Sequence, residues 1–254
     1  MIDLIIFNIQ DSYYAVDIEN IQRIVQSGEL TKVPNAHPLI DGMMSFEDQI
    51  IKIVNFRKML NFQTYDEELN DKFIELKGQH KSWVEALKQT AHTGAEFHKT
   101  SNPHMCELGK WLDSFTSYDD HVSAILKELN RHHKQLHQSA NEVVHLGEES
   151  LEESIKYFEK DVMKIYEHTM GAIDTFIAEF DIVAASLQKL LLYHGDTGSF
   201  AIKVDSIVDI AHIEDEEIKK SNEGSARNEF LELSGVLEFD NKLINVINSI
   251  KIPH

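Results

Sequence analysis

The side chains best suited to metal chemistry in this chain are one cysteine and the histidines on either side of it. Cys106 is the only cysteine among 254 residues, which include 14 histidines. His133 and His137 are four residues apart, so on a helix they face the same side, one turn apart. A third histidine and the thiolate, brought in from neighbouring helices, would complete a tetrahedral set that suits Zn²⁺ best. On spacing alone, ordinary core or surface histidines and a small buried thiol remain an open alternative.

The order and spacing of these residues resemble one known family, the chemoreceptor zinc-binding (CZB) domain, over roughly residues 68 to 184. The resemblance rests on a His-x-x-Trp, a Cys-x-Leu-Gly-x-Trp and a His-x-x-x-His motif, at His80 and Trp83, at Cys106 to Trp111, and at His133 and His137. It implies that the zinc ligands are His80, Cys106, His133 and His137. His104 and His132, beside them in sequence, are interpreted as solvated neighbours.

The same resemblance implies that Cys106 senses oxidants, hypochlorous acid in particular, and that two chains form a homodimer through the helical bundle. The chemistry of the sulfur agrees with this, because zinc keeps the sulfur deprotonated and the thiolate is the oxidisable form. The sequence therefore predicts zinc as the cofactor and a redox-sensing role for Cys106.

Composition excludes several other classes of function. The chain has 24 basic and 43 acidic residues, and the formal net charge of −19 disfavours binding to nucleic acid or anionic membranes. No segment has the length and apolarity of a membrane span, and the first residues lack the pattern of a signal peptide. A single cysteine excludes an internal disulfide. We therefore expect a cytoplasmic protein.

The two ends of the chain carry an internal repeat. Residues 14–24 align without a gap on residues 200–210, and residues 42–55 align on residues 235–248. Both copies alternate apolar and polar residues as strands do, for example over residues 4–9 and 13–17. The sequence predicts that each copy forms its own small β lobe and that a helical block interrupts them. The expected boundaries are 1–65, 66–185 and 186–254.

The block between the copies has a helical pattern throughout. The apolar period predicts a first helix from Phe73 to Thr100, which Pro103 ends, and a short second helix from Cys106 to Leu112. A third helix, capped by Ser117, runs to about residue 146, and a fourth spans roughly residues 148 to 180. Four helices with inward-facing ligands predict a bundle that holds a metal in its core.

The repeated β segments resemble a second family, the CheW chemotaxis coupling proteins, over roughly residues 1 to 65 and 185 to 254. The resemblance rests on the segments 14–18, 33–35, 42–44, 205–207 and 235–236. It implies an α+β fold in which a two-lobed CheW-like β-barrel domain is interrupted by the zinc-binding four-helix bundle. It also implies chemoreceptors and the histidine kinase CheA as partners. The family usually has Arg-Gly at the first hairpin tip, where this chain has Glu47 and Asp48, so docking of these partners through that tip is in doubt.

These observations favour a signalling adaptor over an enzyme. The chain shows no phosphate-binding glycine loop, no G-x-S-x-G motif and no CxxC pair. The alternatives are a zinc metalloenzyme, which needs an open coordination position for water, and a passive zinc buffer, which would not need the β segments. A di-iron bundle needs two Glu-x-x-His pairs, and Glu142 with His145 is the one such pair.

Overall fold

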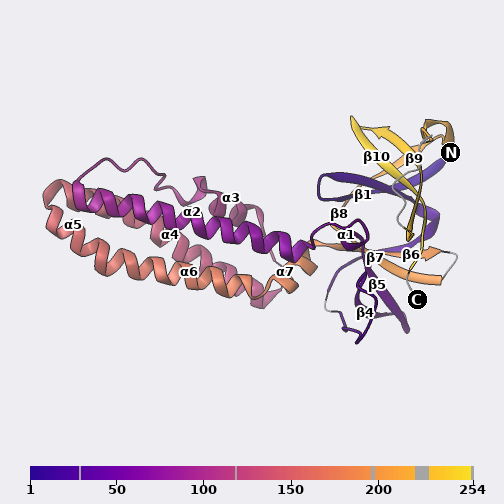
Figure 1. The fold of residues 1–254 in the computed structure, drawn as a ribbon, viewed down its shortest axis with the longest axis horizontal. Helices are drawn as coiled ribbons and strands as arrows, with labels where there is room; N and C mark the ends of the chain where they lie inside the picture. Colours follow the sequence, from indigo (N-terminus) through magenta and orange to yellow (C-terminus); the bar gives the residue numbers. More distant parts are fainter. Residues whose placement is uncertain (29, 118, 196–197, 221–228, 253–254) are drawn as a thin grey trace. The chain divides into compact units, whose positions relative to one another are not determined.

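A computed structural model describes residues 1–28, 30–117, 119–195, 198–220 and 229–252 of the chain. It confirms the predicted α+β class, because it contains two five-stranded sheets and a separate helical region (Figure 1). The chain divides into two compact units. One comprises residues 1–65 together with 184–254, and the other comprises residues 66–183. Each unit is described below by itself.

The first unit holds both sheets. The strand order is β8-β1-β2-β10-β9 in one sheet and β3-β6-β7-β5-β4 in the other. The elements of this unit are β1 (Ile2–Ile9), β2 (Ser12–Asp17), η1 (Ile18–Asn20), β3 (Ile21–Gln26), β4 (Ile40–Phe46), β5 (Gln49–Asn55), α1 (Phe56–Met59), β6 (Lys189–Gly195), β7 (Gly198–Val204), β8 (Ser206–Ile213), η4 (Asp215–Glu217), β9 (Leu231–Phe239) and β10 (Lys242–Ile250).

The strand pairing confirms the internal repeat residue by residue. Phe7 lies opposite Tyr14 in the first copy, as Tyr193 lies opposite Phe200 in the second. The parallel pairs are equivalent as well, since Ala15 lies opposite Val246 and Ala201 lies opposite Ile53. The two copies are therefore related by strand register as well as by sequence.

The prediction that each copy forms its own lobe is wrong. The first copy gives β1 and β2 to one sheet and β3, β4 and β5 to the other, and the second copy exchanges its strands in the same way. A two-stranded hairpin is marginally stable by itself. Pairing with strands of the other copy, through β2 with β10 and β5 with β7, extends each partial sheet to five strands.

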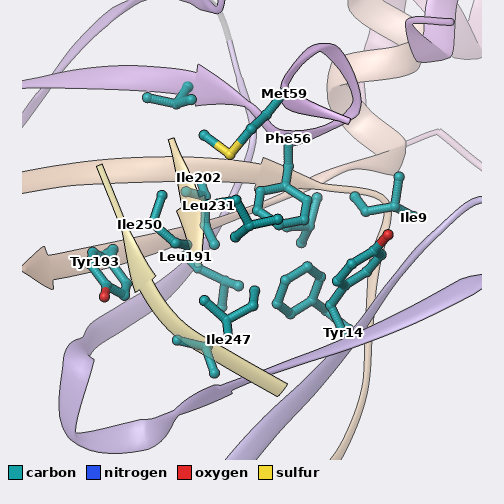
Figure 2. Close-up of a cluster of buried hydrophobic side chains, with 14 of the residues drawn as sticks. Ile9, Tyr14, Phe56, Met59, Leu191, Tyr193, Ile202, Leu231, Ile247 and Ile250 are labelled. Carbon is teal, nitrogen blue, oxygen red and sulfur yellow. The ribbon is translucent and has the colours of Figure 1, made fainter. Parts of the chain in front are cut away.

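One apolar core joins the inner faces of the two sheets. Its side chains come from both copies and from α1, and Figure 2 shows them converging on Phe56. The alternation along β1 and β2 places Phe7 and Tyr14 in this core, where both rings contact the edge of Phe56 at 5.4 Å between centroids. The labelled members in Figure 2 are Ile9, Tyr14, Phe56, Met59, Leu191, Tyr193, Ile202, Leu231, Ile247 and Ile250.

The second unit is helical. Its elements are α2 (Tyr65–Thr93), η2 (Pro103–Met105), α3 (Glu107–Ser114), α4 (Asp120–Glu149), α5 (Leu151–Tyr157), the π-helical turn η3 (Phe158–Val162), α6 (Met163–Ile177) and α7 (Phe180–Leu187). The first residue of α2 and the last four residues of α7 belong to the first unit. The apolar faces of α2, α4, α5 and η3 meet in a core built around Trp83, Leu136 and Phe158.

Several predicted helix ends differ from the structure. The predicted fourth helix, roughly 148 to 180, is divided into α5, η3, α6 and the start of α7. The first long helix begins at Tyr65 rather than Phe73. It ends at Thr93 rather than Thr100, because Gly94 adopts a left-handed φ of 68° that closes the helix. Residues 95–102 therefore form a loop. The N-cap of α4 is Asp119 rather than Ser117, and its carboxylate accepts a hydrogen bond from the backbone N–H of Val122.

Within the described residues, no helix combines the length and the apolarity needed to span a membrane.

Candidate metal centre

The structure brings His80, Cys106, His133 and His137 together in the helical unit. One ligand atom from each lies within 4.8 Å of those from the other three. The Cys106 Sγ atom is 3.1 Å from Nε2 of His133 and 3.9 Å from Nε2 of His80. Within the part of the chain that the structure describes, this is the one group of three or more histidine, cysteine or acidic side chains placed to hold a metal ion.

Three helices position these four side chains. His80 lies on α2, Cys106 is the N-cap of α3, and His133 and His137 lie one turn apart on α4. The rings of His133 and His137 are 4.7 Å apart between centroids, and those of His80 and His133 are 5.2 Å apart. The helical period of α4 thus aims both imidazoles at the N-terminus of α3.

Gly109 allows the cysteine to approach the histidines. The Cys106 sulfur accepts a hydrogen bond from the Gly109 backbone N–H at 3.3 Å, as an N-cap side chain does. A Cβ atom on residue 109 would lie 1.7 Å from the carbonyl oxygen of Pro103, so only glycine fits beneath η2. The glycine of the Cys-x-Leu-Gly-x-Trp motif therefore has a steric cause.

Trp111 fixes α3 to the rest of the helical unit. Its ring contacts the edge of Phe73 on α2 at 4.9 Å and the ring of Phe176 on α6 at 5.5 Å between centroids. Phe73 and Phe176 are fully buried. The second tryptophan of the motif thus holds the helix that carries Cys106 against two neighbouring helices.

Backbone carbonyls select the tautomer of two of the histidines. Nδ1 of His80 lies 2.8 Å from the carbonyl oxygen of Leu76, and Nδ1 of His137 lies 3.1 Å from that of Thr100. A carbonyl accepts only, so each Nδ1 carries the proton and each Nε2 presents a lone pair to the centre of the cluster. The indole N–H of Trp83 donates to the same Thr100 carbonyl at 2.8 Å.

Burial keeps the imidazoles neutral. His80, His133 and His137 are 3%, 1% and 0% exposed. Loss of hydration, with repulsion from the neighbouring histidines, lowers the pKa of His133 to about 2 and that of His137 to about 4, and burial also lowers the pKa of His80. Burial raises the pKa of the Cys106 thiol, against the opposing effect of the Gly109 and Leu108 N–H groups.

The residues present fit a zinc ion. Nε2 of His137 is buried and has no hydrogen-bond partner, and a buried polar atom of this kind costs free energy unless something binds it. Tetrahedral zinc places sulfur and nitrogen ligands about 3.6 Å apart, and the distances from the Cys106 sulfur to His133 and His80, 3.1 and 3.9 Å, lie on either side of that value. Neutral histidines and a thiol that releases its proton on binding are the donor set that zinc prefers.

The other residues named from the sequence lie outside this cluster. Nδ1 of His104 is 2.8 Å from a carboxylate oxygen of Asp113. Nε2 of His132 is 2.9 Å from the guanidinium of Arg131.

The predicted partner-binding residues Glu47 and Asp48 form the turn between β4 and β5. Both have a left-handed φ, 46° and 63°. The Glu47 carboxylate is paired with Arg23 at 3.2 Å. The turn is therefore acidic, with one of its carboxylates partly neutralised.

Comparison with known proteins links both units to families. Residues 3–84 match the CheW-like domain, and residues 80–144 match the chemoreceptor zinc-binding domain. Both resemblances are confirmed. The CZB match includes all four side chains of the cluster, and the CheW-like match covers β1 to β5 and continues into α2.

Two known proteins are similar to this chain, one over about a quarter of its length and one over most of it. The chemotaxis protein CheW of Thermotoga maritima is 27% identical over 66 residues, which are 26% of this chain and 43% of that protein. The chain thus matches less than half the length of that relative. The crystal structure of the scaffolding protein TtCheW from Thermoanaerobacter tengcongensis aligns with 97% of this chain and 88% of its own, at 9% identity and a TM-score of 0.46.

Proposed function

We propose that this protein is a non-enzymatic, cytoplasmic chemotaxis adaptor of the CheW type that binds zinc and responds to oxidants. The first unit is the coupling domain, and the helical unit inserted into it is the sensor. The observation that carries the proposal is the cluster of three buried histidines and Cys106, with the unpartnered Nε2 of His137, inside a segment that matches the CZB domain.

His80, Cys106, His133 and His137 are the proposed zinc ligands. When bound, zinc keeps the sulfur of Cys106 deprotonated and adds its binding free energy to the stability of the helical unit. Four protein ligands close a tetrahedral site and leave no position for a reacting water, which favours a sensor over a hydrolase. His133→Ala is expected to lower both zinc content and melting temperature. Full zinc occupancy with an unchanged melting curve would remove His133 from the ligand set.

Cys106 is the proposed redox switch, and hypochlorous acid is the proposed oxidant. The thiolate forms a sulfur–oxygen bond as the oxygen–chlorine bond breaks, and chloride leaves. Sulfur loses two electrons, chlorine gains two, and the product is a sulfenic acid. This sulfur is a poorer metal ligand, so α3 loses one of its attachments to the histidines. The chain has no second cysteine, so the sulfenic acid is reduced by an external thiol, pairs with the Cys106 of a second subunit, or is oxidised further to sulfinic acid.

Titration with hypochlorous acid tests this role of Cys106. Substoichiometric to equimolar oxidant is expected to release zinc to a chromophoric chelator, and mass spectrometry is expected to locate one added oxygen on Cys106. The seven methionines are the competing targets. The switch is refuted if methionines oxidise while Cys106 remains reduced and zinc remains bound.

Chemoreceptors and the kinase CheA are the proposed partners, with a homodimer formed through the helical unit. The CheW-like match supports this choice of partners. A reconstituted assay of CheA with receptor fragments from the same organism tests it, with and without equimolar oxidant. Oxidant-dependent kinase output that disappears in Cys106→Ser supports the adaptor. Output that is independent of the added protein contradicts it.

A further inference from the structure

Two short segments connect the first unit to the helical insert. The outgoing segment, residues 60–64, follows α1, and the returning segment, residues 185–188, precedes β6. Both segments belong to the first unit. A change in the insert reaches the sheets along the chain through these two segments. The contacts that hold the segments therefore determine which strands such a change affects.

Arg57 of α1 holds the outgoing segment. Its Nη1 donates to the carbonyl oxygen of Gln63 at 3.2 Å. The guanidinium carbon lies 4.5 Å from the centre of the Tyr65 ring, at the first residue of α2. One buried cation therefore contacts both the backbone of this segment and the side chain that follows it at the start of α2.

Asp205 holds the returning segment through Gln188. The Gln188 side-chain amide donates to Oδ1 of Asp205 at 3.3 Å, and Gln188 is 1% exposed. Gln26 of β3 holds the same segment by a different route, since its amide donates to the Gln188 carbonyl at 2.8 Å and to the carbonyl of Ser186 at 2.7 Å.

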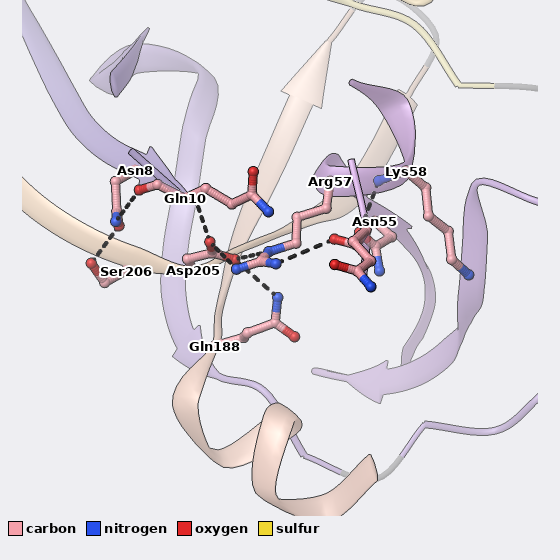
Figure 3. A network of polar contacts seen from close by, with 9 residues as sticks. Asn8, Gln10, Asn55, Arg57, Lys58, Gln188, Asp205 and Ser206 are labelled. Carbon is pink, nitrogen blue, oxygen red and sulfur yellow. Dashed lines mark hydrogen bonds and ion pairs between the residues drawn. The ribbon is translucent and has the colours of Figure 1, made fainter. Parts of the chain in front are cut away.

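A buried ion pair joins Arg57 to Asp205, the two residues that hold these segments, as Figure 3 shows. Arg57 donates from Nε and Nη2 to the two carboxylate oxygens of Asp205, both at 2.7 Å, and the side chains are 1% and 6% exposed. Asp205 lies where the chain passes from β7 in one sheet to β8 in the other. Its Oδ2 also accepts the backbone N–H of Gln10, in the β1–β2 turn, at 2.8 Å.

The internal repeat does not duplicate this ion pair. The repeat alignment places Asp205 on Glu19, which is exposed. Arg57 lies in α1, just beyond the aligned residues 42–55. A buried ion pair is weak evidence of a stabilising role, because desolvation of the charges offsets their attraction. Arg57 comes from the copy before the insert and Asp205 from the copy after it, so the pair joins the two parts of the chain that the insert separates.

We propose that the Arg57–Asp205 ion pair transmits the state of the insert to both sheets. This inference rests on the proposed function, in which the insert senses and the first unit couples. A displacement of either connecting segment changes the contacts of Arg57 or Gln188 with Asp205. The hydrogen bond from the Gln10 N–H to Asp205 then lengthens or breaks. The β1–β2 turn and the junction of β7 and β8 therefore loosen together.

Hydrogen exchange measured on the full chain tests the proposal, in zinc-loaded and zinc-free forms. In the wild type, zinc removal is expected to speed exchange of the Gln10 and Asp205 amides by at least about threefold, as local opening there becomes easier. Gln188→Met keeps the volume and removes the amide donor, so it cuts the route from the returning segment and is expected to reduce that response. Gln26→Met is the matched control, because Gln26 holds the same segment without contacting Asp205, and it is expected to keep the response.

The outcomes separate the ion pair from the proposed function. Tyr65→Leu removes the ring over Arg57 and weakens the route from the outgoing segment, so it is also expected to reduce the response. A full response in both Gln188→Met and Tyr65→Leu overturns the role of the ion pair and leaves the sensor intact. A wild type in which no amide of the first unit responds to zinc contradicts the proposed function itself. Circular dichroism and zinc content check that the variants fold. If Gln188→Met does not fold, an undiminished response in Tyr65→Leu overturns the role of the ion pair.

Discussion

The carbonyl oxygen of Thr100 accepts two hydrogen bonds from separate parts of the zinc motif. One comes from the indole N–H of Trp83 and the other from Nδ1 of His137. The first orients the carbonyl, and the second orients the imidazole whose Nε2 faces the cluster. Trp83 is thus a positioning residue for a ligand that lies on a different helix.

Trp83→Phe is predicted to weaken zinc binding by about 10-fold to 100-fold, the usual cost of losing a group that orients a ligand. Phenylalanine keeps an aromatic ring against Phe97 and His137, so the main change is the loss of the N–H hydrogen bond to Thr100. Competition with a chromophoric chelator measures the affinity. Trp111→Phe is the control, because the structure gives its indole N–H no hydrogen bond within the described residues. Equal affinities for the two variants would contradict the role of Trp83.

At the scale of elements, the contact between η2 and α3 decides where the sulfur lies. Gly109→Ala is predicted to destabilise the protein by about 1–3 kcal/mol, the usual cost of overpacking, because the new methyl group overlaps the Pro103 carbonyl. It is also predicted to weaken zinc binding, since η2 must move away from Cys106. Thermal melts and chelator competition measure the two effects.

Gly171 of α6 supplies a matched control for this substitution. A Cβ atom there meets nothing within 4 Å, so Gly171→Ala is predicted to stabilise the helix by about 0.5–1 kcal/mol. If Gly109→Ala behaves like Gly171→Ala, the steric explanation for Gly109 is wrong.

The sequence predicted which side chains lie together in the cluster better than it predicted the helix ends and the strand pairing. Periodicity indicated the helices of His80 and His133, and the repeat alignment matched residues that occupy equivalent places in the strand pairing. The sequence did not reveal the Thr100 carbonyl, because backbone acceptors leave no compositional pattern. The helix end at Thr93 was missed although Gly94 signalled it. The exchange of strands between copies was missed because local alternation does not identify the partner strand.

For the whole molecule, the proposed coupling depends on the surfaces that the first unit offers to partners. Glu47 and Asp48 occupy a hairpin turn whose repeat equivalents are Asp240 and Asn241, and all four residues have a left-handed φ. The two turns are therefore matched in geometry and differ in sequence.

Restoring the family's Arg-Gly pair at the first turn, in Glu47→Arg with Asp48→Gly, is predicted to raise the association rate with receptor and CheA fragments. Opposite charge at an interface acts mainly on the association rate, and glycine accepts the φ of 63° at position 48 without strain. Surface plasmon resonance measures the rates. The same pair placed at Asp240 and Asn241 is the control. An equal gain from both variants would show a general charge effect and not a docking site at the first turn.

The most direct test of the four-ligand zinc site is zinc-edge X-ray absorption on the purified full chain, with metal content measured on the same sample. We expect one zinc per chain, with one sulfur at about 2.3 Å and three nitrogens at about 2.0–2.1 Å. We also expect the sulfur shell to be lost in Cys106→Ser while the nitrogen shell of any retained zinc persists. A wild-type spectrum without sulfur, or one with two metals per chain, would contradict the four-ligand site and the redox role built on it.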